Sequence, residues 1–584
     1  MLRCFRLVGF HRSTSGITKC SNNRLKYSVT TKRSIHKSPL EPVPIETQNF
    51  GIRMLETLWK HGRADPKKKA FICAENPNIS LTYRQAFTRC QSVAAFFESQ
   101  GLRHGDVACI VLPNSWEFFE ILVGASSRGI GVTTASMLYT EYELSRQFVD
   151  SKAKIVFCGD KALDRVMKAA KTAKTIEKIV VLQVSDREQD LPKGLPDGVI
   201  RYNKVIETMP NLNSATVKVD VKKDIVILPY SSGTTGPPKG VMLSHQAFST
   251  MLSVFTTHYS KYVYPRLDPN WQIQKEPMLL FNPMYHIYGI GLLCVSIIMG
   301  QTGVVMNHFD KHVFYRSIQD YKIRHLFIVP PILVHLVNDP AVDEYDVSSL
   351  EFVLTGGAPT GVDFCKKAIK RLPNLKRIDQ GYGMTECSCW CTQPVIEDSN
   401  PIAETVGTLM ANYEAKIIDS NGNELPPGEP GELLIRSPTL MTGYFAQPKA
   451  TADSLDSEGW FHTGDLIRID EKQRLFVLDR MKELIKVKGY QVAPAELEDL
   501  LLSHHDISDA AVVGVPHEKN GEAPYAFIVR KNPLLTETQI HEFVKEKVAY
   551  YKQLNGGIQF VDSIPKSPSG KILRRILRDS LRNK

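Results

Sequence analysis

The chain has 584 residues and a formal net charge of +10, and 43% of its residues are hydrophobic while 23% are charged. This length exceeds what a single hydrophobic core usually supports, so we expect more than one domain, in an ordinary soluble globular protein. Eleven cysteines without paired spacing exclude the disulfide framework of a secreted domain and favour a reducing compartment.

The positive charge is concentrated at the amino terminus. Residues 1–40 contain nine Lys or Arg and no Asp or Glu, so residues 41–584 carry a net charge of only +1. A near-neutral body argues against nucleic acid as a partner. A leader that is rich in Arg, Ser and Thr and free of acids is typical of a mitochondrial transit peptide, and a disordered basic tail is the alternative.

We assign residues 1–42 to this leader and predict a mitochondrial protein that the mitochondrial import machinery recognises. RSIHKS at 33–38 resembles a processing pattern and places the start of the mature chain between Ile35 and Val43. The terminal LRNK is not the SKL-type peroxisomal address.

Beyond residue 50, helical periods alternate with short β-branched runs, which predicts α/β layers with mainly parallel strands. The runs are KIVFC (154–158), KIVVLQV (178–184), DIVILPY (224–230), HLFIVPP (325–331) and EFVLTGG (351–357). The apolar segment 289–306 contains four glycines plus Gln301 and Thr302, and we interpret it as a buried helix or helix–strand pair. We therefore expect no transmembrane segment, while peripheral association with a membrane stays open.

Past residue 405 the pattern changes to short strands and turns, which predicts a smaller antiparallel subdomain. A second domain is expected from about residue 481, where strand-like runs alternate with two amphipathic helices. The predicted fold class is α/β. It combines a large N-terminal domain (43–480), built of two α/β-layered sheets and a small β-barrel-like subdomain, with a small mobile α+β C-terminal domain (481–584).

Residues 230–245, YSSGTTGPPKGVMLSH, form a loop rich in glycine and hydroxyl residues behind an apolar run. Glycines free backbone N–H groups to face a ligand and hydroxyls add donors, so we expect this loop to bind a polyphosphate. It is not a Walker A motif, because Lys239 is followed by Gly240 rather than by Ser or Thr. A flexible linker is the alternative, and Pro237 with Pro238 counts against it.

This loop resembles the phosphate loop of the adenylate-forming (AMP-binding) superfamily, which includes acyl-CoA synthetases, 4-coumarate-CoA ligases and beetle luciferases. The family's other motifs follow in order: PMYHIYGI (283–290), TGGAP (355–359), DQGYGMTE (379–386), FHTGD (461–465), DRMKELIKVKGYQVAPAELE (479–498) and KSPSGKILRR (566–575). The resemblance covers roughly residues 50–575. HIYG and GYGMTE look closest to the 4-coumarate-ligase-like and luciferase-like branch.

By this resemblance the chain is an AMP-forming acyl-CoA synthetase that uses ATP, Mg²⁺ and CoA. A small-molecule carboxylic acid would attack the α-phosphate of ATP to give an acyl-adenylate and pyrophosphate, and the CoA thiol would then displace AMP. Two anions meet in the first step, so cationic positioning and metal should dominate. Glu386 would bind Mg²⁺, which prefers carboxylate and phosphate oxygens, although taken singly it could be a surface acid.

The resemblance assigns the phosphates of ATP to the 231–240 loop, the adenine to the TGGAP and GYGM segments, and the ribose to Asp465 and Arg480. Taken singly, Asp465 could equally be a helix cap or turn residue. The implied ATP-binding residues are Ser231, Ser232, Gly233, Thr234, Thr235, Gly236, Lys239, Gly357, Ala358, Pro359, Gly381, Tyr382, Gly383, Met384, Thr385, Asp465, Arg480 and Lys571.

Two lysines are implied to act in turn. Lys571 would bridge the carboxylate and the α-phosphate during adenylation. After the C-terminal domain rotates about a hinge at Lys482, Lys486 would replace it, and Lys488 with Gly489 would contact CoA. Outside the motif context these lysines would be read as solvated surface charges. The implied catalytic residues are Lys571, Lys486, His286 and Thr385.

An acyl pocket is implied beside the adenylate, with His286 at its mouth and an ordinary structural histidine as the alternative. The cysteines of TECSCWCTQP (385–394) are interpreted as one face of a strand that lines this pocket. Zinc is disfavoured, because alternate residues on one strand face lie about 6.6–7 Å apart. The acyl-binding candidates are Tyr285, Tyr288, Gly289, Thr355, Gly356, Cys387 and Cys389.

A medium- or long-chain fatty acid is the first substrate expectation, because the candidate pocket residues are mostly apolar or small. An aryl-propenoic acid, as in 4-coumarate-CoA ligases, is the second. The competing functions are a luciferase-like oxygenase, an adenylation module that feeds a carrier protein, and a degenerate acyl- or nucleotide-binding protein. Intact Lys239, Glu386 and Asp465 count against the degenerate protein.

Overall fold

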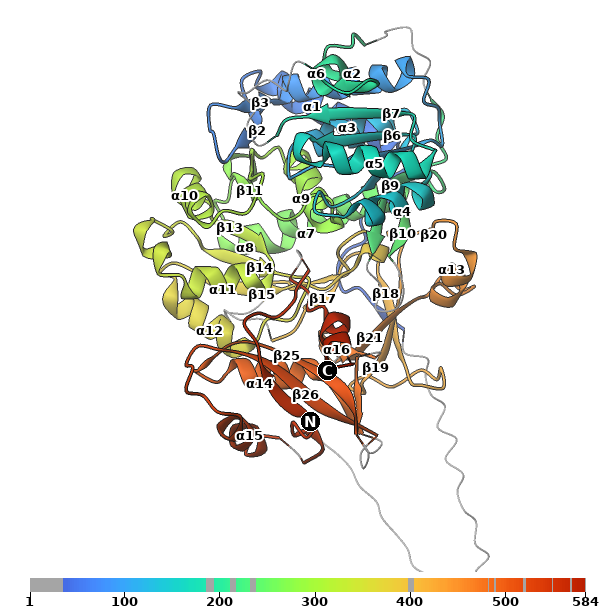
Figure 1. Cartoon of the computed structure of the whole chain (residues 1–584). Helices are drawn as coiled ribbons and strands as arrows, with labels where there is room; N and C mark the ends of the chain where they lie inside the picture. The colour runs from blue at the N-terminus through green and yellow to red at the C-terminus, as the bar shows by residue number, and fades with distance from the viewer. Residues whose placement is uncertain are drawn as a thin grey trace, which may run out of the picture. The chain divides into compact units, whose positions relative to one another are not determined.

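A computed structural model describes residues 35–584 except 185–193, 211–216, 232–237, 397–403, 482, 488–489, 518–520, 549, 568–569 and 583–584 (Figure 1). Strands and helices alternate along the described chain as the sequence predicts. The helices are α1 (Phe50–Ala64), α2 (Tyr83–Ser99), α3 (Glu117–Ser127), α4 (Glu141–Ser151), α5 (Leu163–Ala173), α6 (Tyr202–Ile206), α7 (His245–His258), α8 (Tyr264–Leu267), α9 (Ile287–Ile298), α10 (Lys311–Tyr321), α11 (Pro330–Asn338), α12 (Val362–Arg371), α13 (Pro448–Ser454), α14 (Pro494–Leu502), α15 (Glu537–Lys545) and α16 (Arg574–Arg582).

The largest sheet has the strand order β20-β10-β9-β5-β4-β6-β7-β8. The strands from β9 to β8 in this order pair in parallel, whereas β10 is antiparallel to both β9 and β20. The runs predicted at 154–158, 178–184 and 224–230 supply β6, β7 and β9. The bounds are β20 (Gly443–Tyr444), β10 (Lys239–Ser244), β9 (Ile225–Ser231), β5 (Gly131–Thr134), β4 (Val107–Val111), β6 (Ile155–Gly159), β7 (Lys178–Leu182) and β8 (Val199–Arg201).

Two smaller sheets continue the α/β layering. One has the order β11-β12-β2-β3, and only its β2–β3 pair is antiparallel. The other, β13-β14-β15, is parallel throughout and in register, and it contains the runs predicted at 325–331 and 351–357. The bounds are β11 (Met278–Leu280), β12 (Gly303–Val305), β2 (Lys69–Cys73), β3 (Ser80–Thr82), β13 (His325–Ile328), β14 (Phe352–Thr355) and β15 (Arg377–Gln380).

The remaining sheets are mainly antiparallel, as predicted for the chain after residue 405. A five-stranded sheet has the order β1-β18-β19-β21-β22, and β16 pairs with β17. In the last part of the chain the order is β24-β23-β26-β25, with β27 parallel to β26. The bounds are β1 (His36–Lys37), β18 (Glu414–Ile418), β19 (Gly431–Arg436), β21 (Phe461–Ile469), β22 (Leu475–Arg480), β16 (Thr392–Gln393), β17 (Thr408–Leu409), β24 (Tyr490–Val492), β23 (Ile485–Val487), β26 (Gly521–Arg530), β25 (Ile507–His517) and β27 (Gly557–Phe560).

The apolar segment 289–306 is a helix followed by a strand, as predicted. It begins inside α9, whose first eleven residues are buried, and it ends with β12. Within the described part of the chain, no helix combines the length and the apolar character needed to cross a bilayer. This segment is therefore part of the protein core.

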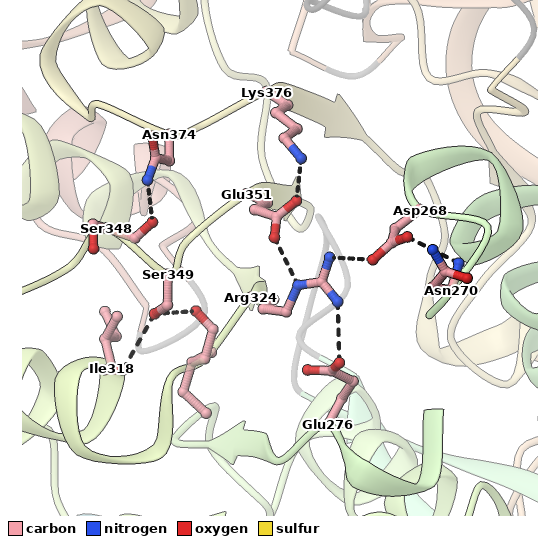
Figure 2. A network of polar contacts seen from close by, with 11 residues as sticks. Asp268, Asn270, Glu276, Ile318, Arg324, Ser348, Ser349, Glu351, Asn374 and Lys376 are labelled. Carbon is pink, nitrogen blue, oxygen red and sulfur yellow. Dashed lines mark hydrogen bonds and ion pairs between the residues drawn. The ribbon is translucent and has the colours of Figure 1, made fainter. Parts of the chain in front are cut away.

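Arg324, at the residue before β13, holds the amino-terminal ends of the three-stranded sheet (Figure 2). Its guanidinium donates to Glu351 (2.7 Å), Glu276 (3.1 Å) and Asp268 (2.9 Å), while Lys376 binds the second oxygen of Glu351. Glu351 precedes β14 and Lys376 precedes β15. The network thus joins the starts of all three parallel strands to the 268–276 loop through charge-assisted hydrogen bonds.

The segment just after residue 34 is built into the antiparallel sheet. In β1, His36 pairs with Ala415 and Lys37 pairs with Glu414 of β18. The His36 side chain is only 6% exposed, and its Nδ1 lies 2.8 Å from the side-chain oxygen of Gln473. The last residues of the segment that we assigned to a leader therefore complete an edge of this sheet.

We expect a chain that begins at Val43 to be less stable than a chain that begins at Ile35. The shorter chain loses the β1–β18 ladder and the buried His36 side chain, which should cost roughly 2–4 kcal/mol at about 0.5–1.5 kcal/mol for each hydrogen bond. The measurement is the urea midpoint of the first unfolding transition. The control is Lys37→Ala in the longer chain, since that side chain is 75% exposed. Equal midpoints for the two chains would contradict the prediction.

Candidate functional site

The site begins at the carboxyl-terminal edge of β14 and β15. Thr355 and Gln380 are partners at the ends of these parallel strands, so the loops that follow leave the sheet side by side. Gly381 N–H donates to the Thr355 carbonyl (2.9 Å), and Gly357 has φ +82°, a conformation that favours glycine. The two predicted adenine segments, 355–359 and 381–384, are thus brought together.

Asp465 lies beside the second of these segments. The Tyr382 hydroxyl donates to its carboxylate (2.6 Å), and Arg480, its partner across the β21–β22 pair, approaches the other oxygen to 3.5 Å. Asp465 is 5% exposed, and burial raises its pKa above the ordinary value while Arg480 offsets part of that rise. This carboxylate is a buried acceptor well suited to the two hydroxyls of a ribose.

A second carboxylate, Glu386, lies at the phosphate side of the site. Ser231, the last residue of β9, donates its hydroxyl to Glu386 Oε1 (2.9 Å), and Tyr444 donates to the same oxygen (3.1 Å). Lys239 begins β10 opposite Ser231, and its ammonium lies 4.9 Å from the centre of the Tyr444 ring. An anion-binding lysine and a carboxylate of the kind that Mg²⁺ takes as a ligand are therefore neighbours.

The Lys571 loop is packed against the same region. Gly570 has φ +79°, and a Cβ at this position would lie 2.9 Å from the ring of Pro331 at the start of α11. Burial, followed by the positive charge of Arg480, lowers the pKa of Lys571 to about 8, so its ammonium is still the main form at neutral pH. The Lys571 ammonium is therefore on the side of the site that contains Asp465 and Arg480.

Three residues beyond Lys571, Arg574 anchors the loop in a buried ion cluster. Its guanidinium binds Glu483 and both oxygens of Glu498 (2.8 and 2.6 Å). Glu498 also accepts from the Val512 backbone (2.8 Å). Because both carboxylates are largely buried, their charges require this partner, and the cluster fixes where the Lys571 loop ends.

His286 is the N-cap of α9 and accepts from the Tyr288 backbone N–H (3.2 Å). Burial, together with the charge of Lys571, lowers the pKa of His286 to about 4, so its imidazole is neutral at physiological pH. The position of His286 at the mouth of an acyl pocket stays a prediction.

Trp390 packs on both α7 and α9, and α9 contains the acyl-binding candidates Tyr288 and Gly289. The Trp390 ring lies 4.0 Å from the ring of Phe255 in α7 and 6.0 Å from that of Tyr288. A Cβ at Gly291 would lie 3.0 Å from the Trp390 indole, so the indole packs directly on α9. The buried Tyr288 hydroxyl has no hydrogen-bond partner within the described residues. Of the remaining candidates, Gly289 and Thr355 are buried, and Tyr285 and Gly356 are half-buried.

The strand predicted for the cysteine run is wrong. Thr385–Cys387 is one turn of 3-10 helix, and Ser388 (φ 60°) and Cys389 (φ 111°) have left-handed backbone conformations. The chain folds back so closely that a Cβ at Gly383 would lie 1.8 Å from the Cys389 carbonyl oxygen. Cys387 and Cys389 are both buried, but they do not share one face of a strand.

Other predicted residues are not brought to the site or cannot be placed. Lys486 is exposed in β23, where its backbone N–H donates to Glu522 (2.7 Å), and no contact joins its side chain to the described site residues. The residues outside the described ranges are Ser232, Gly233, Thr234, Thr235, Gly236, Lys482, Lys488 and Gly489.

Four residues of the site were not predicted: Tyr444, Trp390, Glu483 and Arg574. Trp390 and Arg574 lie inside motif segments that the sequence had already singled out, so their positions could have been noticed. Tyr444 carries no local signal, since its partner Glu386 lies 58 residues away in the sequence.

Comparisons with known proteins agree with this geometry. The family model described as AMP-binding enzyme matches residues 58–445, and the model described as AMP-binding enzyme C-terminal domain matches residues 496–571. The chain is 39% identical over 510 residues to 4-coumarate–CoA ligase 1 of Petroselinum crispum, covering 85% of this chain and 89% of that protein. It is 39% identical over 508 residues to 4-coumarate–CoA ligase 2 of Nicotiana tabacum, covering 86% and 89%.

Among solved structures, ATP-bound MatB from Rhodopseudomonas palustris superposes with a TM-score of 0.78 at 24% identity, covering 92% of this chain and 99% of that one. This likeness confirms the predicted mixed α/β fold with a large N-terminal and a small C-terminal domain.

We predict that acetylation of Lys571 by acetic anhydride follows a pH profile with its midpoint at about 8. Only the neutral amine reacts, and burial beside Arg480 favours the neutral form in the folded chain. Mass spectrometry of the Lys571 peptide measures the profile, and the urea-unfolded chain is the control, with a midpoint near the ordinary lysine value of about 10.4. A folded-state profile that keeps rising to that value would contradict the prediction.

Proposed function

The chain belongs to the family of AMP-binding (adenylate-forming) enzymes and is an ATP-dependent acid–CoA ligase, and we propose that its acid is an aryl-propenoic acid of the 4-coumarate type. The reaction first joins a carboxylate to the α-phosphate of ATP, releasing pyrophosphate. The CoA thiol then attacks the acyl carbon of the adenylate, and AMP leaves.

The observation that carries the proposed mechanism is the position of two carboxylates beside the loop that follows β15: Asp465 accepts from Tyr382 of that loop, and Glu386 lies in the loop and accepts from Ser231 and Tyr444. Asp465 and Tyr382 would hold the ribose and adenine. Lys239 would hold the β- and γ-phosphates, which leave together as pyrophosphate. The Lys571 ammonium would lie between the incoming carboxylate and the α-phosphate, where it offsets the repulsion of two anions.

With its pKa lowered to about 4, His286 is a weak base, so we assign it to shaping the mouth of the acyl pocket. Thr385 follows the adenine segment and is buried, and its hydroxyl would donate to the α-phosphate. These side chains bind and orient the reactants, and none is required to form a covalent bond with them.

The carboxylate of Glu386 suits Mg²⁺, because a hard cation prefers carboxylate oxygens, and the hydroxyls of Ser231 and Tyr444 hold this carboxylate by donating to Oε1. When bound, Mg²⁺ would neutralise charge on the phosphates. Glu386 is the residue of this chain that would hold it.

The second half-reaction would use a different arrangement of the C-terminal domain. Lys486 is exposed on β23 and away from the adenylate-binding residues, so it can act only after this domain moves. We propose a rotation about Lys482 that withdraws Lys571 and brings Lys486, Lys488 and Gly489 toward CoA. Such gating separates the two chemical steps in time.

The proposed acid replaces the fatty acid that we first expected. The 39% identity to 4-coumarate-CoA ligases supports this choice. The mitochondrial leader and import remain predictions from residues 1–42.

We predict pyrophosphate release and thioester formation with aryl-propenoic acids, at a higher kcat/KM than with medium- or long-chain fatty acids. The assay follows pyrophosphate and acyl-CoA for a panel of acids, each with and without CoA. A preference for fatty acids would reverse the substrate assignment. Pyrophosphate without thioester would indicate oxygenase or carrier chemistry, and no pyrophosphate with any acid would indicate a binding protein.

Substitution of the two lysines should separate the half-reactions. Lys571→Ala should lower the rate of adenylation by about 100-fold or more, because the charge between the two anions is lost, yet leave thioester formation from supplied acyl-adenylate nearly unchanged. Lys486→Ala should do the reverse. Single-turnover measurements of each half-reaction test this. The control is Lys366→Ala, whose ammonium is exposed in α12. Equal defects of both variants in both half-reactions would exclude the rotation.

A further inference from the structure

One side chain joins the carboxylate and the lysine at the phosphate side of the site. In β20, Tyr444 lies opposite Val241 of β10, two residues beyond Lys239. Its hydroxyl donates to Glu386 Oε1 (3.1 Å), while the face of its ring lies 4.9 Å from the Lys239 ammonium. The hydroxyl of Tyr444 therefore contacts Glu386, the carboxylate that we assign to Mg²⁺. Its ring contacts Lys239, the lysine that we assign to the phosphates.

The backbone around Tyr444 is fixed from both sides. The Phe445 N–H donates to the Gly240 carbonyl (2.8 Å), which continues the β10–β20 ladder. The Met441 N–H donates to the backbone carbonyl of Glu386 (2.8 Å), so the strand before the tyrosine is tied to the residue that its hydroxyl contacts. The backbone at Tyr444 cannot shift without the loss of these bonds.

The hydroxyl is a donor at physiological pH. A carboxylate only accepts hydrogen bonds, so the phenol is the donor in its contact with Glu386. Tyr444 and Ser231 both donate to Oε1 of Glu386. Within the described residues no hydrogen bond reaches Oε2.

We propose that Tyr444 is a positioning residue for the magnesium complex of ATP: its hydroxyl orients Glu386 toward the metal, and its ring orients Lys239 toward the phosphates. This inference rests on the proposed function of the site. It assigns separate roles to the hydroxyl and to the ring of Tyr444. Removal of the hydroxyl alone and removal of the whole ring should therefore affect ATP binding differently.

The experiment compares Tyr444→Phe with Tyr444→Leu in the full chain by isothermal titration with ATP, with Mg²⁺ and with EDTA. For Tyr444→Phe we expect about tenfold weaker binding with Mg²⁺, as for a lost hydrogen bond to a charged group, and less than about twofold change in EDTA. Tyr444→Leu should also weaken binding in EDTA, by about two- to fivefold, because Lys239 loses the aromatic face.

Two further variants separate positioning from general stability. Tyr315→Phe removes another phenol that donates to a carboxylate, Asp339 (3.3 Å), and should leave both ATP affinities unchanged. Ser231→Ala removes the second donor to Glu386 Oε1. Its combination with Tyr444→Phe should be non-additive, because both hydroxyls act through the same oxygen.

The outcomes distinguish this inference from the proposed function. If the native chain binds no ATP, the proposed function fails. If the native chain binds ATP but Tyr444→Phe binds it equally well with Mg²⁺, or loses the same factor with Mg²⁺ and in EDTA, the positioning role is overturned. A loss confined to the Mg²⁺ arm, in a variant whose circular dichroism matches that of the native chain, supports it.

Discussion

The site depends on the parallel, in-register pairing of β13, β14 and β15. Parallel strands end at the same edge of a sheet, so this pairing alone brings the loops after Thr355 and Gln380 together. At the opposite edge, Arg324 binds three carboxylates and fixes where the strands start (Figure 2). Each of these carboxylates is less than 30% exposed, so the guanidinium compensates charges that water only partly reaches. The ion cluster at one edge of the sheet therefore fixes the strands that position the site at the other edge.

Contacts between distant segments then complete the site. Glu386 takes hydroxyl donors from Ser231 and Tyr444, and Asp465 takes one from Tyr382. Each bond joins parts of the chain that belong to different sheets or loops. Because the acceptors are carboxylates, these bonds are stronger than those between neutral groups.

The sequence was informative where local pattern and global fold agree. Buried parallel strands read as continuous β-branched runs, so the segments that became β6, β7, β9, β13 and β14 were predictable. The run around Cys387 failed because its alternation imitates a strand, while the close approach of Gly383 to the Cys389 carbonyl forces a turn. Tyr444 was not predicted, since its partner Glu386 is distant in the sequence and only tertiary structure identifies it. The order of the family motifs along the chain indicated most of the other candidate site residues.

The pairing of β1 with β18 also affects the order in which the chain can fold during synthesis. His36 is among the first described residues that a ribosome would make, yet its partner Ala415 comes almost four hundred residues later. At about 5–20 residues per second, β1 therefore waits for tens of seconds before its sheet exists. During that time β1 has no partner strand. A factor that binds this segment during translation can therefore reach it before the sheet forms.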